Sequence, residues 1–413
     1  MVINGRFGTA DREFLSDSLT TKSAYISAVL RSAAMKLPQF AVTRRHVMFV
    51  AACLVVCLVN TDRFAPIGHA KPAAPPELSD KQFWSLSRDS SEEDGFFRSD
   101  NLLSNETTFQ YIIPDLLKIA KQGRVYMGVG PEQNFTYMAA LKPSMAFIID
   151  IRHGNLDVHL LYKALFELSK DRAEFVSRMF SRKRPDGLTA KSSADDIFNA
   201  YLAAEGNKEI YEANLKAVED VLVNKHGFAL SAGDLDGIRW ALSNYYQFGP
   251  SISYNSSLSA NIPPSIVGAR GGNRGGNNGV TYASLMMSGD GDSQYRSYLA
   301  SEENFAFLKG LETRNLVVPI VSDFGGNKAI RAVGTYLKSV GAQVSAFYLS
   351  NVEQFLLQDN KWDRFCLSVA SLPIDGTSMF IRSGGGRNGY GRGVGNSSTN
   401  NMLADLAPCM GTR

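Results

Sequence analysis

Apolar runs alternate with helix-like patterns near the middle of the chain, and this alternation predicts strands and helices in turn. An apolar run at 124–129 leads into a glycine turn, a helical pattern over 135–141 and a second apolar run at 145–151. Short apolar runs bounded by turn residues are typical of strands, whereas helices repeat apolar positions three or four residues apart. The order strand, turn, helix, strand predicts a βαβ unit, which is the building block of a parallel sheet.

The same alternation resumes at Asn315. The pattern predicts strands at 316–321, 344–349, 366–372 and 378–381, helices at 327–340 and from 352 to 357, and a loop over the glycine-rich residues 384–395. Combined with the first unit, these elements predict an α/β fold with a Rossmann-like sheet.

The residues between the two parts have a mostly helical pattern. Helices are expected at 156–180, 194–204, 209–224 and 233–246. Ser231 is expected to cap the last helix, with Asp234 three residues further on in a capping-box arrangement. A stretch rich in glycine and asparagine at 268–292 predicts a loop. We therefore expect a large helical insertion over about 156–290, between the second and third strands.

The chain before the first strand divides into a leader, a linker and the start of the folded domain. Residues 71–104 begin with prolines and continue as a polar strap with scattered aromatic residues. A helix is expected from Asn105, which would cap it, to Gln122, and Gly123 would end it. The folded domain is therefore predicted over 105–413.

Residues 35–70 have the pattern of an export signal. Arg44 and Arg45 precede thirteen uncharged apolar residues at 47–59, and a transmembrane helix needs about 20. The run at 43–48 resembles a twin-arginine signal, and 68–70 offers small residues for cleavage. An uncleaved short membrane anchor at 47–59 and a buried apolar helix are the alternatives. The interpretation predicts a periplasmic or otherwise exported protein, with membrane contact only through 47–59.

Residues 1–34 precede a second methionine, Met35, so this stretch is either a mis-called start or a disordered extension. Cys53 lies in the apolar run and could alternatively belong to a lipoprotein signal, and Cys57 follows it in the same run. The exported part would keep Cys366 and Cys409, which could form a disulfide or remain two unpaired thiols.

Composition and charge narrow the function classes. The chain has 413 residues, of which 44% are hydrophobic and 20% are charged, and this composition is typical of a globular protein. The net charge is +3, but residues 1–70 hold eight basic and four acidic residues, which leaves 35 and 36 in the remainder. The folded part therefore has no basic excess, and we expect a small-molecule ligand rather than nucleic acid. The sequence does not indicate an oligomeric state.

Polar residues follow the predicted strands at four places. They are the turn from Gly128 to Gln133, the segment 150–152, Asp323, and the segment 350–353. In an open α/β sheet, ligands bind at the carboxyl ends of the strands. The turn lacks a full GxGxxG pattern because Glu132 and Gln133 occupy its later positions. A carboxylate there would repel a pyrophosphate, so a ligand without phosphates is expected rather than NAD or FAD.

This layout resembles that of class I S-adenosylmethionine-dependent methyltransferases. The stretches GVGPEQNFTY, FIIDIR and YLSNVEQF also resemble an uncharacterised bacterial family described as methyltransferase-like. This second resemblance covers about residues 80–382, without the glycine-rich loops. The resemblance implies a methyltransferase-type sheet and S-adenosylmethionine as cofactor. It places Gly128, Gly130 and Gln133 at the ligand. It further implies that Glu132 holds the ligand's amino group, Asp150 the ribose and Asp323 the adenine, with Ser350 and Asn351 near the methyl acceptor as candidate catalytic residues.

Four of the candidates also have a structural alternative. Glu132, Asp323 and Asn351 could cap the helices that follow them, and Asp150 could form a surface ion pair with Arg152 or Arg124. The polar cluster of Arg152, His153, Asp157 and His159 matches no known metal-ligand spacing, so no metal site is predicted and the cluster is interpreted as loop and helix surface.

Two functions follow from these predictions. The first is an exported methyltransferase-like protein that binds S-adenosylmethionine and transfers its methyl group to an unknown acceptor. The second is a non-catalytic, exported ligand-binding protein on the same Rossmann-like fold. The export signal favours the second, because S-adenosylmethionine is cytosolic unless the protein is loaded before export.

Overall fold

The computed structural model describes residues 77–410 except 98, 255, 257–279 and 384–396. The chain divides at residue 70 into two units, and the described residues belong to the second, Lys71–Arg413. The predicted export signal, anchor, cleavage site and the cysteines Cys53 and Cys57 all lie outside the described residues. Within the described residues, none of the helices combines the length and apolar character that crossing a membrane requires.

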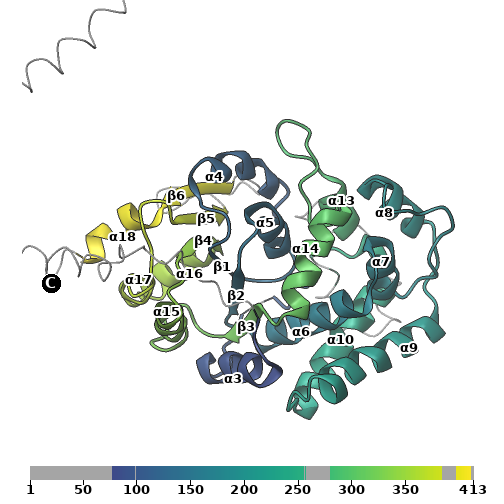
Figure 1. Ribbon diagram of the computed structural model, residues 1–413, viewed down its shortest axis with the longest axis horizontal. Helices are drawn as coiled ribbons and strands as arrows, with labels where there is room; N and C mark the ends of the chain where they lie inside the picture. The colour runs from purple at the N-terminus through teal and green to yellow at the C-terminus, as the bar shows by residue number, and fades with distance from the viewer. Residues whose placement is uncertain (1–76, 98, 255, 257–279, 384–396, 411–413) are drawn as a thin grey trace, which may run out of the picture. The chain divides into compact units, whose positions relative to one another are not determined.

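A six-stranded sheet in the order β3-β2-β1-β4-β5-β6 forms the centre of the domain (Figure 1). Its strands are β1 Val125–Gly128, β2 Met145–Asp150, β3 Val317–Val321, β4 Val344–Ser350, β5 Met379–Ser383 and β6 Ser397–Asn401. The first five strands are parallel, and β6 is antiparallel to β5. The predicted α/β class is therefore confirmed, and so are the predicted strands that correspond to β1–β5. Residues 366–372 do not form the additional strand that the sequence predicted.

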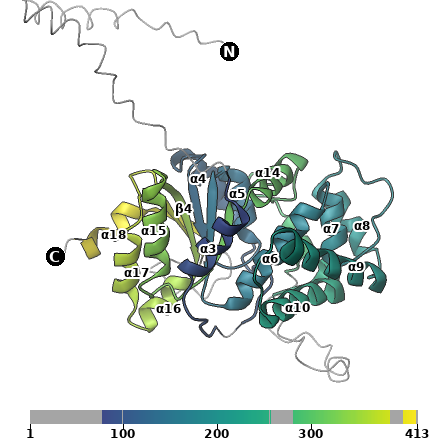
Figure 2. The same ribbon diagram turned by 60° about the horizontal axis from the view of Figure 1, so that its bottom comes forward.

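Helices cover both faces of the sheet (Figure 2). One face carries α15 (Ala329–Ser339) and α17 (Trp362–Val369), and the other carries α5 (Gln133–Leu141) and α6 (His153–Leu168). Every residue of β1, β2 and β3 is buried, because these strands are almost continuously apolar. These three strands can therefore present polar groups to a ligand only at or beyond their ends.

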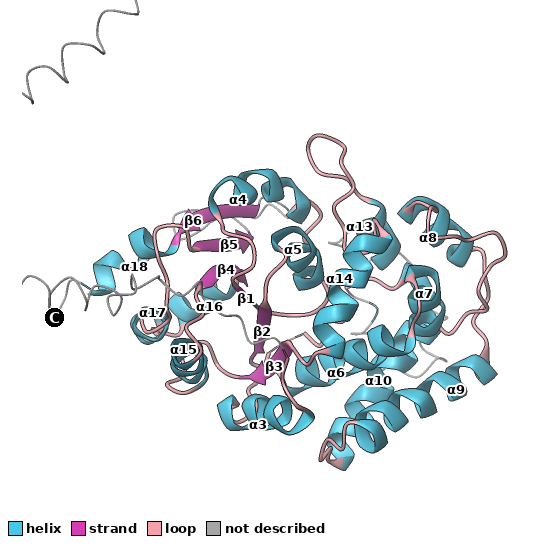
Figure 3. Cartoon of the chain, viewed as in Figure 1, coloured by secondary structure: helices cyan, strands magenta, loops and turns pink. Residues whose placement is uncertain are grey.

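The segment between β2 and β3 is helical, as predicted, but longer than predicted (Figure 3). It contains α6, α7 Arg172–Phe180, α8 Ala194–Leu202, α9 Lys208–Glu219, the π-helical η3 Asp220–Lys225, α10 Ala232–Phe248, η4 Gly249–Ser251, α13 Tyr282–Met287 and α14 Glu302–Thr313. The Ser231–Asp234 capping box is confirmed. The loop prediction at 282–287 is wrong, because Thr281 and Ser284 form a capping box that starts a short helix there.

The helical segment and the sheet share one apolar core. Phe135 of α5 contacts the rings of Tyr162 and Phe166 on α6, and Phe166 in turn contacts Phe175 on α7 and Phe305 on α14. All five side chains are at most 2% exposed. Because these rings link the insertion to the sheet, the two parts form one domain.

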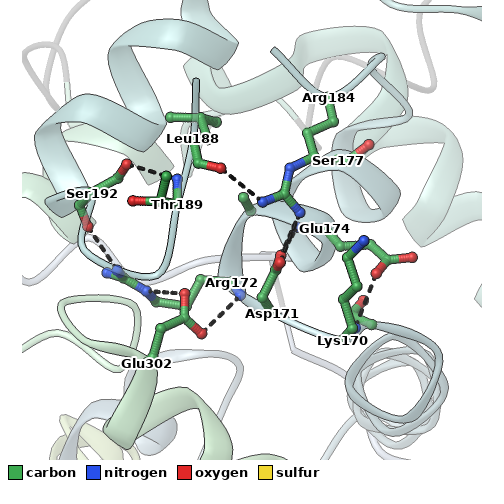
Figure 4. A network of polar contacts seen from close by, with 12 residues as sticks. Lys170, Asp171, Arg172, Glu174, Ser177, Arg184, Leu188, Thr189, Ser192 and Glu302 are labelled. Atoms are coloured by element: carbon green, nitrogen blue, oxygen red, sulfur yellow. Dashed lines mark hydrogen bonds and ion pairs between the residues drawn. The ribbon is translucent and has the colours of Figure 1, made fainter. Parts of the chain in front are cut away.

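A buried guanidinium joins the start of α7 to the start of α14 (Figure 4). Arg172 donates to the Glu302 carboxylate over 2.9 Å, to the Leu299 carbonyl over 2.8 Å and to the Ser192 carbonyl over 2.7 Å. Arg184 makes a more exposed pair with Asp171, the residue that caps α7. These contacts tie together segments about 130 residues apart.

The N-terminal strap contains a helix that the sequence analysis did not identify. Helix α3 spans Asp80–Ser90 and begins with a capping box between Ser79 and Gln82. Further on, η2 Phe109–Ile112 leads into α4 Ile113–Ile119. Asn105 does not cap this helix, because the helical turns begin four residues later. Gly123 has a φ of +73° but does not end the helix as expected, because α4 already ends at Ile119 and Ala120 follows it in an extended conformation.

In the C-terminal part, one predicted strand is wrong. Helix α16 spans Val352–Gln358 as expected, but residues 366–372, predicted as a strand, lie mostly in α17. The apolar positions Phe365, Cys366 and Val369 are spaced for one helix face, and short apolar runs do not distinguish a strand from a buried helix. A final helix, α18, spans Met402–Met410.

A disulfide joins Cys366 on α17 to Cys409 on α18, with their Cα atoms 6.2 Å apart. Of the two states that the sequence left open, the structure therefore shows the bonded one. Disulfides persist in oxidising compartments and are rare in the cytosol, so this bond is typical of a protein outside the cytoplasm.

Candidate functional site

A cavity of about 520 Å³ lies at the carboxyl ends of the parallel strands. Residues that follow four different strands line it: Gly130 after β1, Ile151 after β2, Asp323 after β3 and Asn351 after β4. The order 3-2-1-4-5-6 reverses direction between β1 and β4, and ligands of open α/β sheets bind at this switch point. The cavity therefore occupies the position where the fold favours a ligand.

The structure brings most of the predicted site residues together. Those that line the cavity are Gly130, Gln133, Asp150, Asp323, Ser350 and Asn351. Gly128 and Glu132 do not line it, and each has another role in the turn after β1.

Gly128 makes room for a neighbouring side chain rather than for a ligand. A Cβ atom at Gly128 would lie 1.9 Å from Oδ1 of Asn134. The Asn134 amide donates to the carbonyls of Val129, Gly130 and Pro131, and its Oδ1 accepts from the Tyr126 hydroxyl over 2.9 Å. Asn134 thus fixes the shape of the turn, and the sequence analysis did not identify this role.

Gly130 has the conformation that a glycine turn requires. Its φ is +76°, in the left-handed region that side chains disfavour. Its carbonyl also accepts a hydrogen bond from Nε2 of His159 over 2.9 Å. Burial lowers the pKa of His159 to about 4, so the imidazole is neutral at physiological pH and acts as a donor to the turn.

Glu132 points into the protein interior, so its predicted direct contact with the ligand's amino group does not match its position. The residue is 0% exposed, and its Oε1 accepts from the Ser104 amide over 3.1 Å. Its Oε2 is buried without a hydrogen-bond partner among the described residues. Burial raises the pKa of Glu132 to about 8. The capping alternative is also not observed, since Glu132 precedes α5 but its side chain makes no capping bond.

Asp150 forms an ion pair with Arg152, one of the alternatives considered, but the pair is buried rather than on the surface. Oδ1 of Asp150 accepts from the amide and Nε of Arg152 over 2.9 and 3.1 Å, and Oδ2 accepts from the guanidinium over 3.1 Å. Arg152 also donates to the carbonyls of Ser99 and Asn101, which ties the strap to the cavity. Arg124 instead pairs with Asp375.

Asp323 and Asn351 are not helix caps in the way the alternatives proposed. Asp323 accepts from the amide of Gly325 over 2.8 Å, within the turn that precedes α15, and from Nζ of Lys361 over 2.8 Å. Asn351 is the residue before α16, but its side chain makes no capping bond. Both side chains remain at the cavity.

Glu106 is the site residue that the sequence analysis missed. It is 6% exposed and lines the cavity from the segment between the strap and η2. Its Oε1 accepts from the hydroxyls of Tyr348 and Ser350 over 2.8 and 2.6 Å, and its Oε2 accepts from the Gln133 amide over 2.8 Å. No signal in the sequence marked it, because it follows no predicted strand.

The charge of the cavity is negative overall. Four of its lining residues are acidic and two are basic: Glu106, Asp150, Asp323 and Asp359 against Arg152 and Lys361. Aromatic side chains line the rest of the wall, among them Phe97 and Phe355, whose rings meet edge to face at 5.3 Å. Such a cavity favours a ligand with a flat apolar part and a positive charge.

The polar cluster of Arg152, His153, Asp157 and His159 is not the loop and helix surface that the sequence predicted. Three of the four residues are buried, and His153 is half-buried. Arg152 and His159 support the cavity through Asp150 and Gly130 as described above. His153 and Asp157 instead face Asp234, which the sequence analysis assigned only to helix capping.

Comparison with protein families finds one match within this domain. The family described as "Domain of unknown function (DUF7790)" matches residues 102–227 and 281–401. The matched ranges include all the cavity residues discussed above except Phe97, Ser99 and Asn101, which precede residue 102. That description does not mention methyltransferases. Comparison with curated proteins finds no match.

Proposed function

The chain belongs to the DUF7790 family, and we propose that its domain binds a nucleoside-type ligand of the S-adenosylmethionine class in the cavity beyond β1, β2 and β4. The observation that carries this proposal is the excess of carboxylates on the cavity wall at the switch point of the sheet. Strand order and cavity position support a Rossmann-like, methyltransferase-type sheet as part of the same proposal.

Charge is the first argument. S-adenosylmethionine carries a cationic sulfonium and an amino group, whereas NAD and FAD carry a pyrophosphate. Four carboxylates against two cations attract the former and repel the latter. Glu106, rather than Glu132, is the buried carboxylate that a cationic group can approach, because Glu106 lines the cavity and Glu132 does not.

Hydrogen-bonding capacity limits how Asp150 can act. A carboxylate offers about four acceptor positions, and Arg152 occupies three of those on Asp150. One position on Oδ2 is left, so Asp150 would accept one ribose hydroxyl rather than two. Asp323 would accept from the adenine amino group, and Phe355 would supply an apolar surface for the base.

Methyl transfer is the reaction that this ligand would support. It requires mainly that the acceptor lies in line with the sulfonium, so a dedicated base is not needed. Ser350 and Asn351, at the end of β4, would lie at the acceptor side of the cavity. A second candidate, a non-catalytic exported binding protein, is favoured by the disulfide between Cys366 and Cys409, since S-adenosylmethionine is a cytosolic metabolite.

A calorimetric titration of the full-length protein with S-adenosylmethionine, S-adenosylhomocysteine and NAD tests the proposal, alongside mass spectrometry of any ligand extracted from the purified protein. We expect binding of the methionine-derived ligands and none of NAD. Asp323→Asn should weaken that binding about tenfold, because it removes one charged-group hydrogen bond. Binding of NAD alone, or equal binding by Asp323→Asn, would overturn the proposal. Transfer of a labelled methyl group to a cell extract separates the enzyme from the binding protein.

A further inference from the structure

Three potential metal-ligating side chains converge where the start of α6 meets the start of α10. His153 and Asp157 lie one turn apart on α6, and Asp234 lies in the first turn of α10. Nε2 of His153 is 2.5 Å from Oδ1 of Asp234 and 3.8 Å from Oδ1 of Asp157. One ligand atom from each residue lies within 4.8 Å of the others.

An unpartnered carboxylate oxygen points into this cluster. Asp157 is 3% exposed, and its Oδ1 has no hydrogen-bond partner among the described residues. A buried carboxylate oxygen without a partner is costly, and here a second buried carboxylate, Asp234, lies beside it. Helix α10 approaches closely at this point, because a Cβ atom on Gly237 would lie 2.1 Å from Oδ2 of Asp157. The packing of the two helices therefore holds Asp157 in place.

We propose that His153, Asp157 and Asp234 bind one divalent first-row metal ion of the Zn²⁺ or Mn²⁺ type. Imidazole nitrogen with two carboxylates is a donor set that such ions accept, whereas Mg²⁺ and Ca²⁺ prefer oxygen ligands alone. Bonds of about 2.0–2.2 Å place neighbouring ligand atoms roughly 3–3.5 Å apart, so small side-chain rotations of the three residues reach the required spacing. The His153 side chain is 31% exposed, which leaves water access to the remaining coordination positions.

Neighbouring hydrogen bonds orient the proposed metal ligands. Oδ2 of Asp234 accepts from the Ser231 amide over 2.6 Å, which orients Oδ1 toward His153. The His153 amide donates to Asp94 over 2.7 Å, which fixes the backbone at the start of α6. Groups that orient ligands in this way raise the affinity of metal sites.

The metal site is separate from the ligand cavity. None of its three residues lines that cavity, but Arg152, the partner of Asp150, immediately precedes His153. A bound ion would fix the start of α6 against α10 and so support the Arg152–Asp150 pair. The proposal does not depend on the identity of the ligand in the cavity.

The test is a titration of untagged, full-length protein with Zn²⁺ by calorimetry and with Mn²⁺ by electron paramagnetic resonance. Mn²⁺ is included because it prefers oxygen and nitrogen ligands to thiols, whereas Zn²⁺ could also bind to Cys53 and Cys57. Variants Asp157→Asn and His153→Gln should each weaken binding by at least about tenfold. The matched control is Asp236→Asn, which removes an exposed carboxylate two residues from Asp234 on the same helix.

We expect one equivalent of each ion to bind the wild type and Asp236→Asn with equal affinity. Without metal, Asp157→Asn should unfold at or above the wild-type temperature, because it removes one of two adjacent buried carboxylates, so a loss of binding would not reflect a loss of the fold. The proposal is overturned if the wild type binds neither ion at one equivalent. It is also overturned if Asp157→Asn and His153→Gln bind both ions as tightly as Asp236→Asn does.

Discussion

The hydroxyl of Ser350 donates to the carboxylate of Glu106 over 2.6 Å, although the two residues are 244 positions apart in the chain. This bond joins the segment just after the N-terminal strap to the carboxyl end of β4. Ser350 adopts a φ of +49°, an uncommon conformation for a residue other than glycine. Residues with a strained backbone cluster at ligand sites, and both Ser350 and its partner Glu106 line the cavity wall.

Glu106→Gln should weaken binding of an S-adenosylmethionine-type ligand by about tenfold or more, because it removes a buried negative charge from the cavity wall while keeping the side-chain size. Calorimetry measures the change. The matched control is Asp359→Asn, which removes a carboxylate from the exposed rim and should have a smaller effect. Equal affinities of wild type and Glu106→Gln would show that the ligand's charge lies elsewhere.

Gly128→Ala should lower the free energy of unfolding by about 1–3 kcal/mol, because its Cβ would collide with Asn134. The turn after β1 would shift, and ligand affinity should fall with it. Chemical denaturation measures the change in stability. Gly310→Ala is the matched control, since Gly310 lies within α14 with open space around it and alanine favours a helix. If Gly128→Ala is as stable as the wild type, Asn134 moves freely and does not hold the turn.

Much of the sheet could be predicted from the sequence because its strands are short, apolar and bounded by turn residues. The βαβ unit around Gly130 and the strand ends at Asp150, Asp323 and Ser350 were placed correctly for this reason. The error at Cys366 has the opposite cause, since an apolar run of seven residues fits a strand and a buried helix face equally well.

The missed site residues come from contacts that no local pattern encodes. Glu106 reaches the cavity only because the segment after the strap lies against Gln133 and Ser350, and Asp234 meets Asp157 only because α10 packs on α6. Glu132 was misplaced for a related reason. The sequence places it in the turn, two residues after Gly130, but the direction of its side chain depends on its contact with the strap residue Ser104.

The stability difference between Glu132→Gln and wild type should increase as pH rises. The pKa of Glu132 is raised from about 4.5 to about 8 in the folded state, so between these values the folded protein keeps a proton that the unfolded chain releases. Unfolding is therefore favoured by up to about 1.4 kcal/mol for each pH unit through this window. Thermal unfolding of both proteins from pH 5 to 8.5 tests this. The stability of Glu132→Gln relative to wild type should be greatest at about pH 8. Parallel curves for the two proteins would contradict the raised pKa.

Arg172→Met should lower the free energy of unfolding by about 3–5 kcal/mol. It removes a guanidinium that is itself buried, and it leaves the Glu302 carboxylate without its ion-pair partner and three backbone carbonyls without this donor. Arg184→Met is the matched control, because the Arg184–Asp171 pair is about 30% exposed and should contribute about 1 kcal/mol or less. Chemical denaturation compares the two. Similar losses would show that burial does not distinguish these pairs.

Cys409→Ser should lower the free energy of unfolding by about 2–4 kcal/mol, because the disulfide to Cys366 closes a loop across 43 positions of the chain and restricts the unfolded state. Thermal unfolding with and without a reductant measures the contribution. The reductant should lower the unfolding temperature of the wild type and leave that of Cys409→Ser unchanged. The variant therefore serves as the control for effects of the reductant that do not involve this disulfide. Labelling of free thiols in protein taken directly from cells then links the bond to the compartment. If Cys366 and Cys409 are labelled without prior reduction, the bond does not form in the cell and the argument for an exported protein loses its support from the structure.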